Sequence, residues 1–312
     1  MMYCMSDIHG VGYAFDNIMR QIDLQPDDKL YIIGDVIDRG PDGIALLQRI
    51  MEMPNCTFLL GNHEQMMLYA YTHPDEEKRK LNLRAWKENS SYSTRAAFER
   101  LSAEEQEKLL DFLRNAPIEL NFAVGERKYC LVHACPLECF DAEEAFYKGM
   151  NDVEYSVWHR VYPEEELLSD STVVFGHTPT MHFQDNEPQA VWFGDNRICI
   201  DCGAGLHSRF GGRLGCLRLD DMQEFYAEIS EDHEKLRLKL TEMGIKILTH
   251  FPNDEERANN GWMWICAHGT DYDSVMRRIE HCNEHYQTEA VYLVDRAIFY
   301  KNKDKKTEIN KQ

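Results

Sequence analysis

Short apolar runs recur through the first 228 residues, and a polar residue capable of chemistry follows each run directly. Buried strands read as short, nearly continuous apolar runs. Open α/β sheets bind ligands beyond the carboxyl ends of their strands. The pattern therefore predicts an α/β core whose strand ends converge on one site. The runs cover residues 3–5, 30–33, 57–60, 129–132, 173–175 and 198–200.

The apolar spacing changes to that of helices between residues 64 and 117. Residues 102–105 (Ser-Ala-Glu-Glu) predict a capping box, with Leu109, Leu110 and Leu113 on the apolar face behind it. This helical insertion separates motifs that must meet in space. We therefore expect it to lie over or beside the site, either as a lid that shapes substrate access or as a plain packing layer.

The character of the chain changes again near Ser230, which predicts two domains, residues 1–228 and residues 229–312. The second is expected to be a small α+β module with a polar tail, and its role is left open. Its expected elements are a charged amphipathic helix at 231–243, strands at 262–267 and 290–294, and a second helix at 275–286.

Charge and cysteine usage narrow the class of protein. The 312 residues carry a formal net charge of −20, which repels nucleic acid and anionic membranes. The first polar motif begins at residue 6, which leaves no room for a signal peptide, and no apolar run is long enough to span a bilayer. We therefore expect a cytoplasmic protein whose ten cysteines are reduced thiols.

Four short motifs and one His-Ala pair supply the polar residues in a fixed order. Together they offer carboxylates, imidazoles, one amide and one arginine, the groups needed to hold two metal ions and a phosphate. The motifs are Ser-Asp-Ile-His-Gly at 6–10, Gly-Asp-Val-Ile-Asp-Arg-Gly at 34–40, Gly-Asn-His-Glu at 61–64, His-Ala at 133–134 and Gly-His-Thr-Pro at 176–179.

Six of these residues are predicted metal ligands. Asp7 and His9, one residue apart at a strand end, can face the same ion. Asp35 is the natural bridge, because a carboxylate has two oxygens to share. The amide and the other two imidazoles would complete the coordination of a second ion. Mixed oxygen and nitrogen ligands suit manganese, iron or zinc better than calcium. The six ligands are Asp7, His9, Asp35, Asn62, His133 and His177.

Three further residues are predicted to handle the substrate. His63 follows a predicted ligand and can donate a proton to the leaving alkoxide. Asp38 can hold that imidazole in one tautomer and orientation. Arg39 offers a planar fork to two phosphate oxygens.

Over residues 2–228, the order and wording of the motifs resemble the phosphoprotein phosphatase branch of the calcineurin-like metallophosphoesterases, especially its bacterial and phage-type members. The resemblance implies a four-layer α/β/β/α sandwich and the metal and substrate roles given above. It also implies that Arg160, in Val-Trp-His-Arg, is a second phosphate arginine. The stretch that starts at Trp86 is similar to a bacterial Trp-to-Asn-Gly-Gly segment in which serines replace both glycines. Ala134 and Cys135, which follow His133, depart from the family pattern, where glycines are typical.

The expected activity is metal-dependent hydrolysis of phosphomonoesters, with a metal-bridging hydroxide as nucleophile and manganese as the favoured metal. A phosphoserine or phosphothreonine protein is the preferred substrate, and a dinucleoside polyphosphate such as diadenosine tetraphosphate is the alternative. A non-catalytic scaffold that binds a phosphorylated partner would be expected to have lost ligands or the proton donor. Because the predicted ligands and the proton donor are all present, the sequence favours an enzyme over a scaffold. The native metals and the oligomeric state stay open.

Overall fold

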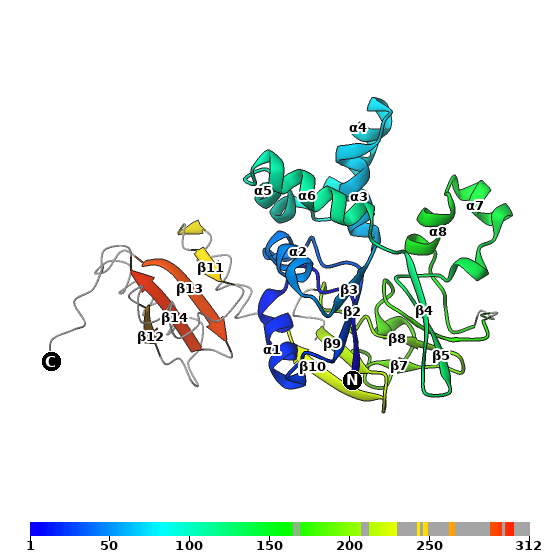
Figure 1. The fold of residues 1–312 in the computed structure, drawn as a ribbon. Helices are drawn as coiled ribbons and strands as arrows, with labels where there is room; N and C mark the ends of the chain where they lie inside the picture. The colour runs from blue at the N-terminus through cyan, green and yellow to red at the C-terminus, as the bar shows by residue number, and fades with distance from the viewer. Residues whose placement is uncertain are drawn as a thin grey trace. The chain divides into compact units, whose positions relative to one another are not determined.

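The chain divides into two compact units, Met1–Glu228 and Ile229–Gln312 (Figure 1). Each unit is described by itself below. The computed structural model describes residues 1–164, 167, 169–206, 212–229, 242–243, 246–248, 262–265, 288–294 and 297–302.

Three adjacent parallel strands of the first sheet bring three motifs together. The strand order is β10-β9-β1-β2-β3, in which β1, β2 and β3 are parallel and the outer pair is antiparallel. The carboxyl ends of parallel strands emerge at one edge, so the loops that begin at residues 6, 34 and 61 lie side by side. The strands are β1 (Met2–Met5), β2 (Lys29–Ile33), β3 (Cys56–Leu59), β9 (Arg213–Arg218) and β10 (Gln223–Glu228).

The second sheet delivers the remaining histidines in the same way. Its order is β4-β5-β6-β8-β7, and β5, β6 and β8 are parallel. All six apolar runs noted in the sequence form strands of these two sheets. The strands are β4 (Glu119–Val124), β5 (Arg127–Val132), β6 (Thr172–Phe175), β7 (Trp192–Phe193) and β8 (Arg197–Cys199).

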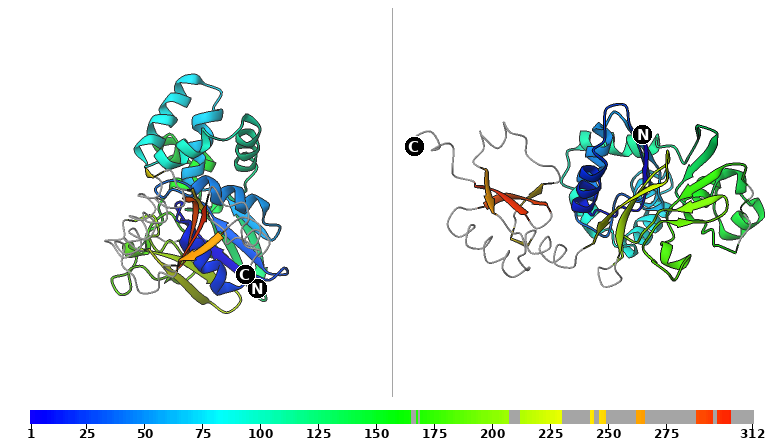
Figure 2. Two further views of the ribbon diagram at one scale, coloured as in Figure 1. Left: turned by 90° about the vertical axis from the view of Figure 1, so that its left-hand side faces the viewer. Right: turned by 90° about the horizontal axis from the view of Figure 1, so that it is seen from below.

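The two sheets pack face to face with helices on both outer sides. Leu131, Val174 and Leu217 belong to the buried cluster between the sheets. Ala145 and Tyr155 bring the second helical layer onto the outer face of the second sheet. Figures 1 and 2 show the resulting four layers, which confirm the predicted α/β/β/α sandwich. The covering helices are α1 (Gly12–Ile22) and α2 (Gly43–Glu52) on one side, and α7 (Ala142–Lys148) and α8 (Asp152–Trp158) on the other. Two short 3-10 helices cover Leu137–Cys139 and Thr180–His182.

Four helices follow β3, where the sequence predicts a helical insertion. The first begins directly at the end of the strand, so Asn62 and His63 occupy its first turn. The capping box is present: the Glu105 N–H donates to Ser102 Oγ at 3.3 Å, and the Ser102 N–H donates to Glu105 Oε2 at 2.8 Å. The helices are α3 (Asn62–Thr72), α4 (Glu76–Glu88), α5 (Tyr92–Phe98) and α6 (Ala103–Arg114).

The second unit contains a four-stranded sheet of order β11-β13-β14-β12. Two of its strands coincide with the runs expected near residues 262 and 290, whereas the expected helices at 231–243 and 275–286 lie almost entirely outside the described residues. Among the described residues, no helix is both long enough and apolar enough to cross a bilayer. The strands are β11 (Lys246–Leu248), β12 (Trp262–Ile265), β13 (Thr288–Val294) and β14 (Ala297–Asn302).

A matched pair of leucine truncations tests the packing between the sheets. Leu131 is fully buried, whereas Leu81 on α4 is 65% exposed. Leu131→Ala should lower the free energy of unfolding of the first unit by about 2–5 kcal/mol, because it removes buried surface and leaves a cavity. Leu81→Ala should change it by less than about 0.5 kcal/mol. Urea unfolding measures both, and equal effects would contradict the assigned core.

Candidate active site

Six of the predicted site residues have a left-handed backbone conformation. Aspartate and histidine tolerate this region better than most residues, but each instance still costs on the order of 1 kcal/mol. Interlocked loops hold the conformation: the His9 N–H donates to Asp35 O, and the Gly40 N–H donates to His9 O, both at 2.9 Å. Strain is therefore concentrated where the predicted chemistry lies. The φ angles are 52° for Asp7, 48° for His9, 54° for Asp35, 69° for Asp38, 63° for Arg39 and 65° for His177.

Glu64, whose role the sequence did not reveal, fixes the loop after β2. Its buried carboxylate accepts the backbone N–H groups of Asp35 at 2.9 Å, Val36 at 2.8 Å and Ile37 at 3.1 Å. Burial and the nearby Asp35 charge raise the pKa of Glu64 to about 7. The residue ends the Gly-Asn-His-Glu motif, and that position was the only sequence signal for its function.

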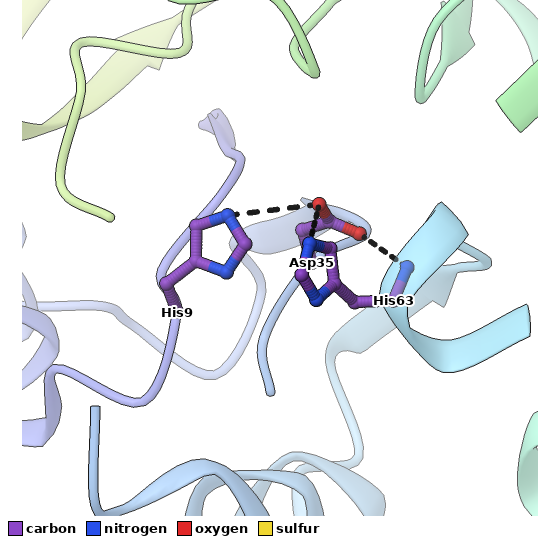
Figure 3. A group of neighbouring side chains, drawn as sticks. All are labelled: His9, Asp35 and His63. Carbon is purple, nitrogen blue, oxygen red and sulfur yellow. Dashed lines mark hydrogen bonds and ion pairs between the residues drawn. The ribbon is translucent and has the colours of Figure 1, made fainter. Parts of the chain in front are cut away.

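Asp35 lies at the centre of two groups of possible metal ligands. One group contains His9, Asp35 and His63, the other Asp35, His133 and His177, and the ligand atoms within each group lie within 4.8 Å of one another. Asp35 Oδ2 is 3.6 Å from His9 Nε2 and 3.8 Å from His63 Nε2 (Figure 3). Asp35 Oδ1 is 3.4 Å from His133 Nε2. Each oxygen of this one carboxylate thus faces a different group.

All three predicted ligand histidines are oriented by backbone carbonyls. One ring nitrogen of each donates outward, which leaves the lone pair of the other nitrogen facing the site. Metal-binding histidines in proteins are typically held this way. The outward contacts join His9 Nδ1 to Ile37 O (3.0 Å), His133 Nδ1 to Ile33 O (2.8 Å) and His177 Nε2 to Trp158 O (3.2 Å).

The atoms that converge at Asn62 fit a cation. Asn62 Oδ1 lies 3.0 Å from His133 Nε2 and 3.0 Å from His177 Nδ1. Once a cation replaces the proton of His133, the tautomers set by the carbonyls leave three lone-pair donors pointing at one region. Burial alone would lower the pKa of His133, but the adjacent Asp35 raises it to about 10. The protein's own groups therefore favour positive charge here, and their oxygen and nitrogen donors suit manganese, iron or zinc.

Asp7 lies at the edge of this cluster, outside the two closest groups. Its Oδ1 is 3.8 Å from His9 Nε2, so one oxygen is placed to share an ion with that histidine. The other oxygen, Oδ2, accepts the Ser6 hydroxyl and the His177 N–H.

Asp201 is a further buried carboxyl group near Asp7, after β8. Burial together with the Asp7 charge raises the pKa of Asp201 well above its ordinary value. Its place directly after an apolar run was a signal that the ligand prediction did not use.

The two predicted phosphate arginines flank the cluster from different elements. The guanidinium of Arg39 lies against the backbone of Gly205, where an added Cβ would be 2.5 Å from Arg39 Nη1 and 2.3 Å from His9 Cδ2. Arg160 Nη1 donates to Thr178 Oγ1 at 3.0 Å and to His177 O at 3.3 Å. Both side chains therefore lie next to predicted ligands, and Gly205 is a site residue that the motifs did not reveal.

His63 and Asp38 form the predicted pair. His63 Nδ1 lies 2.6 Å from Asp38 Oδ2, and its Nε2 faces Asp35. Burial would lower the pKa of His63, but the Asp35 and Asp38 carboxylates raise it. Trp86 also reaches Asp38, with its Nε1–H donating to the same Oδ2 at 2.7 Å.

Most of the first unit matches a family of known proteins. Residues 2–209 match the family model described as calcineurin-like phosphoesterase. The chain belongs to the calcineurin-like phosphoesterase family. Membership of the family implies divalent metal ions, and the structure has two groups of histidine and aspartate side chains around Asp35 that could hold them.

Several curated relatives carry one of two names. The symmetrical bis(5'-nucleosyl)-tetraphosphatase of Delftia acidovorans is 31% identical over 226 residues, 71% of each chain. The protein of the same name from Acidovorax sp. strain JS42 is 30% identical over 189 residues, and the matched region spans 58% of each chain. Serine/threonine-protein phosphatase 2 of Salmonella typhimurium is 27% identical over 188 residues, 56% of this chain and 78% of that protein.

Gly205→Ala tests whether the close approach of this backbone is needed. The new methyl group would displace the ring of His9 and the guanidinium of Arg39, so manganese affinity should fall at least about tenfold. Gly125→Ala is the control, because nothing lies within 4 Å of its added Cβ although its φ is +60°. That variant should lose stability but keep its affinity. Isothermal titration with Mn²⁺ measures both, and equal affinities in the two variants would contradict the assigned packing.

Proposed function

We propose that the protein is a dinuclear metal-dependent hydrolase of phosphoric esters or anhydrides. The observation that carries the proposal is the placement of Asp35, whose two oxygens face separate groups of ligand atoms within one buried cluster. A carboxylate shared in this way is what a two-metal site requires. A scaffold that merely binds a phosphorylated partner would not need the proton donor that lies beside it.

Each part of the cluster has a proposed task. Asp7, His9 and Asp35 would hold one ion, and Asp35 with Asn62, His133 and His177 would hold the other. When bound, the two ions would stabilise negative charge on the phosphoryl oxygens and lower the pKa of a water molecule.

The substrate-handling residues surround these ligands. Arg39, which lies near His9, and Arg160, which donates to His177 O, orient the phosphate. His63 gives its Nε2 proton to the leaving oxygen, while Asp38 holds the imidazole by Nδ1 at 2.6 Å.

A dinucleoside polyphosphate is the first candidate substrate. The support is the name of the two relatives above that are at least 30% identical, one of which matches over 71% of each chain. This reverses the order of preference drawn from the motifs alone.

A phosphoserine or phosphothreonine protein is the second candidate. The Salmonella relative named as a serine/threonine phosphatase is matched over 78% of its length. The Asp38–His63 pair also suits this substrate, because an alkoxide leaves only with a proton.

Replacement of the shared carboxylate tests the metal mechanism. Asp35→Asn should lower manganese-stimulated hydrolysis of an aryl phosphate at least about a hundredfold, because an amide offers one ligand oxygen and no charge. Chelation should abolish the activity of the unchanged protein, and added Mn²⁺ should restore it. Asp141→Asn, at the N-cap of α7, is the control, since asparagine caps helices equally well. Full activity in Asp35→Asn would sink the proposal.

Parallel assays separate the two substrates. With diadenosine tetraphosphate and a phosphoserine peptide at equal concentrations, we expect a kcat/KM for the nucleotide at least about tenfold higher, which corresponds to about 1.4 kcal/mol of transition-state binding. Cleavage of diadenosine tetraphosphate at the centre of its polyphosphate should give ADP as the sole nucleotide product. A preference for the peptide would instead favour the protein phosphatase.

A further inference from the structure

The indole of Trp86 shares an oxygen with the proposed proton donor. Trp86 lies on α4 within the helical insertion, and its side chain is completely buried. Its Nε1–H donates to Asp38 Oδ2 at 2.7 Å, while His63 Nδ1 lies 2.6 Å from the same atom. A buried indole N–H needs an acceptor in any case, and here that acceptor is the oxygen that also holds the imidazole of His63.

The other oxygen of Asp38 is unsupported. Asp38 Oδ1 is buried and has no hydrogen-bond partner among the described residues. The carboxylate is therefore held through Oδ2 alone, by the indole and the imidazole. Without the indole, rotation about Cβ–Cγ could exchange the two oxygens, and the imidazole would lose its fixed partner.

The same part of the insertion also holds the backbone around Asp38. The Asp38 N–H donates to Thr94 Oγ1 at 2.9 Å, and the Arg39 N–H donates to Ser90 O at 3.0 Å. Two residues after Asp38, the carbonyl of Gly40 accepts the Ser93 hydroxyl at 2.7 Å. The segment from Trp86 to Thr94 thus binds residues 38–40 through both backbone and side chain.

We propose that Trp86 is a positioning residue for protonation of the leaving group, an inference that rests on the proposed hydrolase function. Trp86 fixes the Asp38 carboxylate, and the carboxylate fixes the orientation of His63. As the oxygen of an attacking hydroxide, derived from water, forms its bond to phosphorus, the bond between phosphorus and the leaving oxygen breaks. The leaving oxygen takes the electron pair of that bond and receives the Nε2 proton of His63. The imidazole is left neutral, with its Nδ1–H still donated to Asp38.

Leaving groups of different basicity test this role. Trp86→Phe keeps an aromatic ring but removes the N–H. For an alkyl phosphate, which needs protonation, its kcat should fall about tenfold with little change in KM. For 2,4-dinitrophenyl phosphate, whose leaving group needs no proton, kcat should change less than about twofold. Equal losses with the two substrates, or no loss with either, would overturn the positioning role.

A packing control comes from the same aromatic cluster. Tyr71 contacts both Trp86 and Phe98, with ring centroids 6.0 Å and 4.7 Å apart, and Phe98 is 1% exposed. Phe98→Leu should lower the Tm without changing the ratio of the two kcat values. A changed ratio in this variant would mean that loosened packing alone produces the effect, and would also overturn the proposal.

Two further variants keep the test decisive. In His63→Ala, adding Trp86→Phe should cause no further loss with the alkyl phosphate, because the indole acts only through that imidazole. If Trp86→Phe does not fold, 3-benzothienylalanine at position 86 keeps the indole shape with sulfur in place of N–H. The unchanged protein separates the two ideas. If it hydrolyses neither these two phosphates nor diadenosine tetraphosphate, the proposed function fails. Hydrolysis of diadenosine tetraphosphate alone, or full activity with an unaltered ratio in the variants, removes only the role of Trp86.

Discussion

The buried Asp35 carboxylate is the group on which the rest of the site depends. A charge removed from water must be matched by nearby donors or positive charge, and Asp35 meets this requirement with a different neighbour at each oxygen. Its backbone is held in turn by Glu64, and its loop is interlocked with the loop that carries His9. The left-handed conformations are tolerated because these contacts leave the loops little freedom to relax.

The helical insertion contributes to this arrangement directly. The sequence left open whether it serves as a lid or as a packing layer. The segment from Trp86 to Thr94 lies against the loop that holds Asp38 and Arg39, and it makes hydrogen bonds to both backbone and side chain there. This segment of the insertion therefore supports the loop that carries Asp38 and Arg39. This explains how a segment with no ligand residues beyond its first turn can influence chemistry.

The sequence predicted the fold and the members of the cluster because parallel strands bring their carboxyl ends to a shared edge. It could not predict contacts that depend on how distant elements pack. Glu64 reaches back to the loop after β2, and Trp86 reaches Asp38 across 48 positions. Gly205 matters only because its backbone approaches His9. The unused signal was Asp201, which follows a strand just as the predicted ligands do.

The central claim is that Asp35 is shared by two metal ions. Anomalous diffraction at the manganese edge, from crystals of the manganese-loaded protein, tests it most directly. We expect two peaks about 3.5–4 Å apart, with the Asp35 carboxylate between them and each peak ligated by a different oxygen. A single peak, or two peaks that do not share Asp35, would contradict the account.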